Sequence, residues 1–469
     1  MNTNKLYING EYVDSKSEKW IEVENPANEE IIAKVPRSNE EDVNLAVKAA
    51  KEAFKSWSKV DINKRIEYVE KFNDWMKNHK EEFLKTMTEE LGVPHDFCEK
   101  SQFDRMPKRT ENFIKQAKDF KLIDKMDGGY VRREPIGVIA CITPWNYPLG
   151  QIIQKVIPAI IAGNTIVLKP SKQTPLTAYL LVKGFDEIGL PKGVLNLVTG
   201  AGSEVGNVMS SHEDVDMVSF TGSTKGGIEV GKAGLETVKN ITLELGGKSP
   251  AVFIEGADVE KGVKQVLNTI FLNTGQTCSA LSRIVVLESE KEKVVNEVLK
   301  QYDNYIVGDP KDPDVNVGPL SSKKQFEKVQ KYVQKGIDEG AKLLKGEKIE
   351  KNGRGYYVKP VVFDNVTTEM SIHKDEIFGP VLVIETAKDY DELIEIANAV
   401  DYGLSSAVFG EKEKAIEIAE KIKAGEVSVN NPSGDINLPF GGYKQSGIGR
   451  EGGSYGLDEY FEVKSVIVD

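Results

Sequence analysis

The chain has 469 residues, 40% hydrophobic and 29% charged, a composition typical of a globular protein with roughly two to four domains. Its formal net charge is -12 and its longest basic cluster is the pair Arg132–Arg133, so we expect no nucleic-acid partner. The longest apolar runs are far shorter than a membrane span, and residues 1–17 lack the basic-then-apolar order of a signal peptide. We therefore expect a cytoplasmic protein without membrane contact.

The first hundred residues open with two alternating segments, "KLYINGEYV" and "WIEVENPANEEIIAKVP", which predict short strands. Apolar residues then recur every three or four positions between residues 40 and 87, which predicts helices. Between residues 138 and 244 short apolar runs alternate with helical stretches: "GVIACI", "NTIVLKP", "GVLNLVTG", "DMVSFTG" and "NITLELGG". This alternation predicts right-handed crossovers and a doubly wound parallel sheet.

A second α/β pattern runs from residue 249 to about residue 446, with predicted strands at "AVFIE", "SRIVVLE", "YVKPVVF", "VLVIETA" and "SSAVFG". No repeat or low-complexity linker marks the boundary between the two patterns. The segment "YFEVKSVIVD" predicts a further strand. Its free edge has to be covered, and pairing with another subunit is the simplest way to do so.

Three cysteines at wide spacing suit a reducing compartment and argue against a disulfide framework: Cys98, Cys141 and Cys278. Four scattered histidines, without a CxxC or HExxH motif, predict no metal site. Cys278 lies in the polar stretch "NTGQTCSALSR", whereas a free cysteine is usually packed as a small hydrophobe. This setting makes its thiol a candidate functional group.

Open parallel sheets bind ligands at the carboxyl ends of their strands, so the residues that follow each apolar run are candidates for a site. Asn146 follows the first run, and Lys169 ends the second with Lys172 close behind. The turn "TGSTKGG" opens a helix whose free N–H groups suit a phosphate. Glu244 lies between two leucines, where burial would raise its pKa toward that of a general base. Taken singly, each of these signals is weak, since amides often satisfy their own turns and lysines are often only solvated.

Together, seven motifs in order resemble the NAD(P)-dependent aldehyde dehydrogenase superfamily over essentially the whole chain: "TPWNYP", "LKPS", "FTGST", "LELGGKSP", "GQTC", "EIFGP" and "PFGGYKQSGIGRE". The resemblance implies an α/β subunit with three parts. These are a Rossmann-like cofactor domain (1–112 and 136–246), a catalytic domain (247–446), and a small β oligomerisation element (113–135 and 447–469). The element would comprise a hairpin near residues 113–135 and the terminal strand, and would build a homo-oligomer, either a dimer or a tetramer.

The resemblance also implies catalytic roles. Cys278 would be the nucleophile, since a thiolate adds readily to an aldehyde carbon. The Asn146 side chain and the Cys278 backbone N–H would stabilise the resulting oxyanion. Glu244 would activate the water that hydrolyses the thioester. Lys155 is expected to point into the same cleft with a supporting role, and Glu451 would assist proton relay, although an exposed glutamate is the commoner reading of that position.

For the cofactor, the resemblance implies NAD or NADP and no metal, with contacts from Trp145, Lys169, Lys172, Gly222, Ser223, Gly227, Leu245, Glu376 and Phe378. Many NAD-preferring relatives carry a glutamate at the position of Lys172, where it repels the 2′-phosphate of NADP. A cation there removes this repulsion. We therefore predict that NADP is tolerated and that NAD is also used.

Several alternatives share parts of this pattern. A CoA-acylating semialdehyde dehydrogenase has the same fold but generally lacks the glutamate at position 244. A structural protein of the same fold would not need the catalytic set. A cysteine hydrolase would need a histidine base, and the four histidines lie outside every strand-end motif.

The sequence leaves the aldehyde open. The expected entry tunnel is shaped by Tyr147, Gln151, Thr277, Ser279 and the loop "PSGDINLP". These residues are mixed in character, and Asp435 in that loop could repel anions. No arginine clearly commits the site to a carboxylated semialdehyde.

Overall fold

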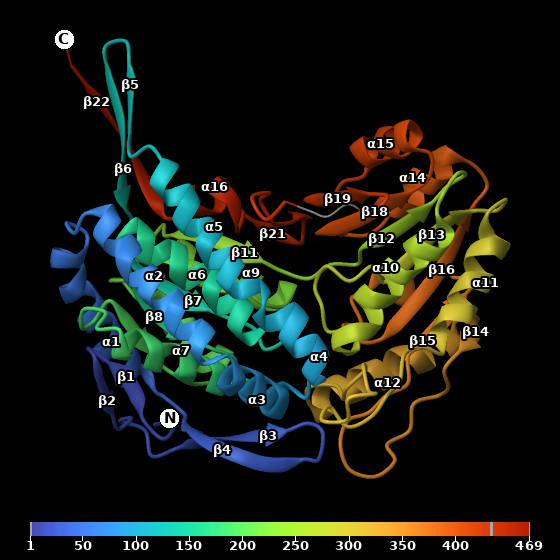
Figure 1. Ribbon diagram of the computed structural model, residues 1–469, viewed down its shortest axis with the longest axis horizontal. Coiled ribbons are helices and arrows are strands. Elements are labelled where there is room, and N and C mark those ends of the chain that lie inside the picture. Colours follow the sequence, from blue (N-terminus) through green and yellow to red (C-terminus); the bar gives the residue numbers. More distant parts are fainter. Residues whose placement is uncertain (1, 432–434, 469) are drawn as a thin grey trace.

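The computed structural model describes residues 2–431 and 435–468. Two sheets, each covered by helices, form the two halves of the molecule (Figure 1). Among the described residues, no helix combines the length and the apolarity needed to cross a membrane. The prediction of an α/β fold with parallel sheets is confirmed.

The first sheet has eight strands in the order β2-β1-β9-β8-β7-β10-β11-β21. Its parallel centre runs from β9 to β11, and β1, β2 and β21 are antiparallel additions. The bounds are β1 (Leu6–Ile8), β2 (Glu11–Val13), β7 (Val138–Ile142), β8 (Thr165–Lys169), β9 (Leu195–Leu197), β10 (Met217–Thr221), β11 (Asn240–Glu244) and β21 (Gly447–Ile448).

Helices cover both faces of this sheet. Along β7, Ile139 and Cys141 pack into one hydrophobic core, while Val138, Ala140 and Ile142 pack into another on the opposite face. This alternation gives a sheet buried on both sides. The helices are α1 (Glu40–Trp57), α2 (Ile62–Asn78), α3 (Lys80–Leu91), α4 (His95–Phe97), α5 (Arg105–Asp119), α6 (Pro148–Ala162), α7 (Leu176–Glu187), α8 (Asn207–Ser211) and α9 (Thr224–Leu235).

The second sheet has seven strands in the order β14-β15-β16-β13-β12-β18-β19, all parallel except β14. They are β12 (Pro250–Phe253), β13 (Arg283–Leu287), β14 (Lys342–Lys345), β15 (Val361–Asp364), β16 (Val381–Ala387), β18 (Ser405–Phe409) and β19 (Glu426–Val429). The helices are α10 (Val259–Phe271), α11 (Lys291–Tyr302), α12 (Lys323–Asp338), α13 (Ser371–Lys374), α14 (Tyr390–Asn398) and α15 (Lys412–Lys421).

The remaining strands form small sheets: β3 (Trp20–Asn25) with β4 (Glu30–Pro36), β17 (Tyr402–Gly403) with β20 (Tyr443–Lys444), and β22 (Phe461–Ile467) with β6 (Gly129–Pro135) and β5 (Ile123–Met126). A short helix, α16 (Gly453–Asp458), precedes β22. The β5–β6 hairpin and β22 project from the body of the molecule (Figure 1). In this sheet β22 is an edge strand, paired only with β6.

The projecting element is smaller than its predicted ranges. Residues 113–119 are the end of α5, which packs against α2 and α6, so the hairpin begins only at residue 123. The apolar residues Phe113, Ile114 and Ala117 are buried on that helix. Similarly, β21 belongs to the first sheet, where Leu243 pairs with Ile448. Only β22, of the predicted range 447–469, joins the hairpin.

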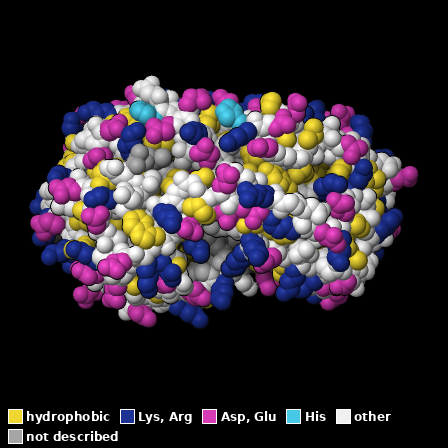
Figure 2. Space-filling view, turned by 90° about the horizontal axis from the view of Figure 1, so that it is seen from below, with side chains coloured by type: hydrophobic (Ala, Val, Ile, Leu, Met, Phe, Trp, Pro, Cys, Tyr) yellow, Lys and Arg dark blue, Asp and Glu magenta, His cyan; other side chains and the backbone are white. Residues whose placement is uncertain are grey.

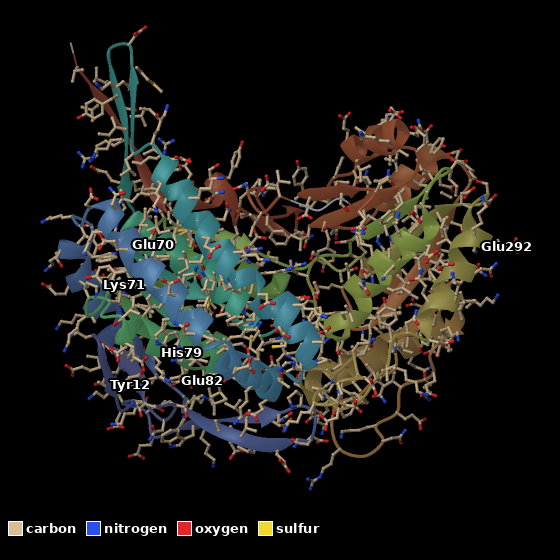
Figure 3. All side chains as sticks on the ribbon, in the orientation of Figure 1. Tyr12, Glu70, Lys71, His79, Glu82 and Glu292 are labelled. Atoms are coloured by element: carbon tan, nitrogen blue, oxygen red, sulfur yellow. The ribbon has the colours of Figure 1, made fainter. Side chains whose placement is uncertain are left out.

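The molecular surface carries interspersed charges of both signs on the face seen in Figure 2. Many of these charges join neighbouring helices. Glu70 of α2, labelled in Figure 3, accepts from Lys118 of α5 at 2.9 Å. Exposed pairs of this kind contribute little to stability, so the buried hydrophobic cores carry the fold.

Candidate active site

Four parallel strands of the first sheet end side by side. The register pairs Ile142 with Lys169 and Thr221 with Glu244, so β7, β8, β10 and β11 end at one edge. The loops that follow them carry most of the residues singled out in the sequence. This edge is where an open parallel sheet binds its ligand.

Cys278 lies where two cavities meet. One cavity, of about 630 Å³, is lined by Trp145, Gly222, Glu376 and residues of α12. The other, of about 460 Å³, is lined by α5, α6 and parts of the second domain. Among the residues that the structure describes, only Cys278 and Gln151 line both cavities. A thiol in this position can meet one ligand from each side.

The loop before Cys278 has an unusual backbone that fixes its course. Asn273, Thr274 and Gly275 adopt left-handed conformations, with φ of 52°, 55° and 70°. Such a run is strained for non-glycine residues and requires compensating contacts. Asn273 Nδ2 supplies them by donating to the backbone oxygens of Asn146 at 3.1 Å and Gln276 at 3.2 Å. The loop is therefore held to the first domain.

Asn146 is buried beside the thiol loop, with 4% of its surface exposed. Its Nδ2 donates to the backbone oxygen of Gln276 at 2.9 Å. An amide nitrogen carries two hydrogens, so a second donor remains for a ligand. Asn146 lines the first cavity together with Cys278. This is the arrangement expected of an oxyanion donor.

The Cys278 thiol is a weak acid in this setting. Burial raises its pKa to about 12, and the neighbouring Glu376 and Glu244 carboxylates add to the rise. The thiol is therefore protonated at neutral pH in the absence of ligands. A nucleophilic role requires that a base or a bound cation favour the thiolate.

Glu244 ends β11 with 2% of its surface exposed. Neither carboxylate oxygen has a hydrogen-bond partner among the described residues. Burial raises its pKa well above the usual value, and the charge of Glu451 raises it further. Glu244 itself lines neither cavity, but the next two residues, Leu245 and Gly246, line the first. An unpartnered carboxyl group thus lies just behind the wall of the first cavity.

Lys155 does not point into the cleft as expected. It is fully buried, donates to Ser219 Oγ at 3.0 Å, and forms an ion pair with Glu451. Glu451 is 3% exposed, so the expectation of an exposed glutamate fails. Burying either charge without the other would be costly in free energy, which explains why the two charges occur together. Neither residue lines a cavity; the charge of Glu451 raises the pKa of Glu244 and the charge of Lys155 opposes that rise.

Six of the nine predicted cofactor residues line the first cavity: Trp145, Gly222, Ser223, Leu245, Glu376 and Phe378. A Cβ on Gly246 would lie 2.4 Å from a Glu376 oxygen, so the glycine lets the backbone approach that carboxylate. The other Glu376 oxygen accepts from Gly247 N at 3.0 Å. The Trp145 and Phe378 rings meet edge to face, with centroids 5.4 Å apart.

The three other predicted cofactor residues, Lys169, Lys172 and Gly227, do not line this cavity. Lys169 is buried and donates to Pro170 O at 2.8 Å. Burial lowers its pKa to about 8, and the nearby charge of Lys172 contributes. Lys172 is exposed. Gly227 lies in the first turn of α9, where a Cβ would collide with Leu245 at 2.5 Å.

The turn "TGSTKGG" opens α9 as predicted. Ser223 caps the helix by accepting from Gly226 N at 3.2 Å. The first N–H groups of the helix thus face the region beside the cavity, where they and the helix dipole favour an anion. Together with the carboxylate of Glu376, which can accept from sugar hydroxyls, this donor and acceptor set fits a dinucleotide.

The sequence did not single out several lining residues. From α12, Lys328 and Tyr332 line the first cavity. From α5, Arg105 and Arg109 line the second. The two arginines are four positions apart, which is a helical spacing, but they belong to no motif. The only available signal was the helical periodicity of the segment that contains them.

The residues expected to shape the tunnel lie on the wall of the second cavity: Tyr147, Gln151, Thr277, Ser279 and Asp435. Tyr147 and Thr277 share a hydrogen bond of 2.9 Å between their hydroxyls. Of the loop "PSGDINLP", residues 432–434 lie outside the described residues.

Comparison with models of protein families identifies the family to which this chain belongs. Residues 12–466 match the model of the aldehyde dehydrogenase family, and the chain belongs to that family. It is an enzyme that oxidises aldehydes with a nicotinamide cofactor, and the prediction of this class from the seven motifs is confirmed.

Individual relatives agree over the full length. A protein of Staphylococcus haemolyticus named as an aldehyde dehydrogenase is 42% identical, covering 99% of this chain and 98% of its own length. A crystal structure of an AldC variant from Pseudomonas syringae, with NAD⁺ and octanal, has a TM-score of 0.97 at 39% identity, covering 99% of this chain and 96% of that one. Betaine aldehyde dehydrogenase from Staphylococcus aureus, with NAD⁺, has a TM-score of 0.96 at 37% identity, covering 99% and 97%.

Proposed function

We propose that this enzyme oxidises an aldehyde to the free carboxylic acid through a thioester on Cys278, which is then hydrolysed with the help of Glu244. The observation that carries the proposal is the position of Cys278 where the two cavities meet. The first cavity has the donors and acceptors that suit a dinucleotide, so the second is left for the aldehyde. Binding both ligands against one thiol supplies the proximity that the reaction needs.

The Cys278 sulfur adds to the aldehyde carbon, and its proton leaves to a base. The new oxyanion accepts from Asn146 Nδ2 and from the Cys278 backbone N–H. Bound dinucleotide supplies the hydride acceptor. Loss of hydride from carbon leaves the thioester, and Glu244 takes a proton from the water that attacks it. Water supplies the acid oxygen, and the thiol is regenerated.

Glu244 also distinguishes this proposal from transfer of the acyl group to CoA. A buried carboxylate without a hydrogen-bond partner is costly and is retained where a proton acceptor is needed. A purely structural protein would have no use for that arrangement next to a thiol. Hydrolysis is therefore the fate of the thioester that the site supports best.

The test is Glu244→Gln, which removes the base but keeps the shape. We expect a burst of one reduced cofactor per active site, followed by stalled turnover, because acylation precedes the step that needs Glu244. Rapid mixing with absorbance at 340 nm measures both phases. Full steady-state activity in this variant would refute the role of Glu244.

Cys278→Ala is the matched control. It removes the nucleophile, so both the burst and the turnover should disappear. Binding of the dinucleotide, measured by calorimetry, should be largely kept, because the thiol is not one of the proposed adenosine or ribose contacts. Loss of dinucleotide binding would instead show that the cysteine is structural.

The dinucleotide is proposed to be NAD, with NADP also accepted. Lys169 and the start of α9 would hold the adenosine end, and the exposed cation Lys172 lies close enough to Lys169 to lower its pKa. No acidic side chain occupies position 172 to repel a 2′-phosphate. Charge alone therefore gives no reason to exclude NADP.

The enzyme is proposed to work as a homo-oligomer, a dimer or a tetramer, assembled through the projecting sheet. The strand β22 has an unpaired edge in the single chain, and its residues Val463 and Ile467 are 60% and 89% exposed. An apolar strand edge in water invites pairing with another strand. A second copy of the chain is the natural partner.

Truncation from Phe461 tests this assembly. We expect dissociation or aggregation, because removal of β22 uncovers the edge of β6. Sedimentation velocity measures the outcome. A truncated protein that keeps its native sedimentation coefficient would contradict the proposal.

A further inference from the structure

The wall of the second cavity is polar on the side of α5. One face of this helix lines the cavity through residues spaced at one and two turns: Arg105, Met106, Arg109, Asn112 and Phe113. Positions four apart lie on the same face of a helix, so the two guanidinium groups belong to one wall. The cavity of about 460 Å³ has Cys278 on another part of its lining.

Neither arginine is neutralised by an ion pair within the described part of the chain. Four other arginines show the contrast, because each has a close acidic partner: Arg37 pairs with Glu204, Arg132 with Glu134, Arg133 with Asp458 and Arg283 with Glu385. The Nε of Arg109 is buried and has no hydrogen-bond partner among the described residues. Burial lowers its pKa, with the charge of Glu451 opposing the change, yet an arginine stays charged at neutral pH.

Two glutamines of α6 add to this unsatisfied polar wall. Gln151 and Gln154 are each 8% exposed, and both line the cavity. Among the described residues, neither side-chain oxygen has a hydrogen-bond partner. Buried polar groups without partners are uncommon in folded proteins and point to a ligand or water that completes them.

Two acidic residues, Glu426 and Asp435, line the same cavity. The Asp435 carboxylate is engaged in its own turn, where it accepts from Asn437 N at 2.9 Å and Asn437 Nδ2 at 2.6 Å. Burial raises the pKa of Glu426, with Arg109 as the opposing charge. Glu426 forms no ion pair with either arginine among the described residues, and the Arg109 Nε still lacks a hydrogen-bond partner there.

We infer that the aldehyde oxidised by this enzyme carries a carboxylate at its far end, bound by Arg109 with support from Arg105. The inference rests on the proposed function, because it uses the second cavity as the aldehyde site. A guanidinium binds a carboxylate through two parallel N–H donors, which gives both attraction and orientation. An aldehyde with an apolar or cationic end would leave Arg109 without a partner.

The experiment compares three aldehydes with purified enzyme and NAD⁺. Glutaric semialdehyde and pentanal differ only in that a methyl group replaces the carboxylate, and betaine aldehyde carries a cation instead. We expect kcat/KM for glutaric semialdehyde to exceed that for pentanal by about tenfold or more. The preference should weaken as salt is added. Preference for pentanal or betaine aldehyde would overturn the inference.

Arg109→Gln should reduce the ratio of the two kcat/KM values by about tenfold, and Arg109→Lys should keep part of it. Arg105 is exposed, so Arg105→Gln should leave the fold intact and serves as a second variant, for which we expect a smaller loss of the ratio. Lys108→Gln removes an equal charge from an exposed α5 position outside the cavity lining and is the matched control. An unchanged ratio in both arginine variants would overturn the inference.

The outcomes separate this inference from the proposed function. If pentanal is oxidised and the carboxylate gives no advantage, the inference alone fails. If none of the three aldehydes yields reduced cofactor, the proposed function fails and the inference fails with it.

Discussion

The two cavities that meet at Cys278 are built in different ways. The wall of the first depends on backbone: a Cβ at Gly246 would lie 2.4 Å from Glu376, and one at Gly222 would lie 2.5 Å from the Phe220 ring. The wall of the second is largely side chain, with one face of α5 at its centre. A side chain added at these two glycines must displace its neighbours, whereas the α5 face of the second wall can exchange one side chain for another.

This difference separates two kinds of specificity. The fixed first wall suits a ligand that every catalytic cycle shares, namely the dinucleotide. The adjustable second wall suits a ligand that differs between relatives, namely the aldehyde. A substitution in one cavity should therefore alter specificity for the ligand of that cavity and leave specificity for the other ligand unchanged.

Asn146→Ala should have the largest effect, because Asn146 lines the first cavity beside Cys278 and acts on the reacting oxygen itself. We expect kcat to fall by about 10²–10³-fold, whichever aldehyde or dinucleotide is used. The backbone oxygen of Asn146 still accepts from Asn273, so the thiol loop should keep its shape. Steady-state kinetics measures the loss, and an unchanged unfolding temperature serves as the control. A loss confined to one aldehyde would contradict a role at the oxyanion.

Lys172→Glu should act on the dinucleotide side alone. We expect kcat/KM for NADP to fall at least about tenfold relative to NAD, because the new carboxylate repels the 2′-phosphate. The ratio between two aldehydes should stay the same. Lys71→Glu makes the same charge change on the exposed face of α2 and serves as the control (Figure 3). An enzyme that rejects NADP before mutation would show that Lys172 does not face the ribose.

The smallest expected effect concerns Glu244, which lies behind both walls and lines neither. Because burial raises its pKa in the folded state, the folded protein binds this proton more tightly than the unfolded chain does. Stability from this group is therefore present below its ordinary pKa and is lost as the pH rises through the raised value. Glu244→Gln should thus unfold at a higher temperature than the native enzyme at alkaline pH. Equal unfolding temperatures across the pH range would contradict the isolation of this carboxyl group.

Much of the fold and of the first cavity follows from local sequence. Strand-end motifs place Asn146, Gly222 and Glu244 correctly because the carboxyl ends of parallel strands share one edge. Local sequence does not predict a side-chain contact between residues that are far apart in the chain. Glu451 lies in a polar loop segment, and only the pairing of β21 with β11, some two hundred residues earlier, buries its side chain against Lys155.

The second cavity was less predictable for the same reason. Arg105 and Arg109 look like ordinary solvated residues of an amphipathic helix. Their place in the cavity wall depends on the packing of α5 against α6 and opposite the second domain, and no local sequence pattern predicts that packing. The misplaced start of the hairpin has another cause, because its range followed from the family resemblance, whereas Phe113 and Ile114 are buried on α5.

The order in which the two sheets appear along the chain has a consequence for synthesis. All seven strands of the second sheet lie between residues 250 and 429, whereas the first sheet needs both β1 and β21. A nascent chain that has emerged to residue 430 can complete the second sheet.

The same nascent chain still lacks Glu451, the partner of Lys155, and Tyr460, whose backbone oxygen accepts from Asn164 at 2.9 Å. Until those residues emerge, the first domain has a buried lysine without its counter-charge and an unpaired strand edge at β11. We therefore expect the first domain to finish folding after the second. The need for chaperones should be greatest between the emergence of residue 430 and that of residue 460.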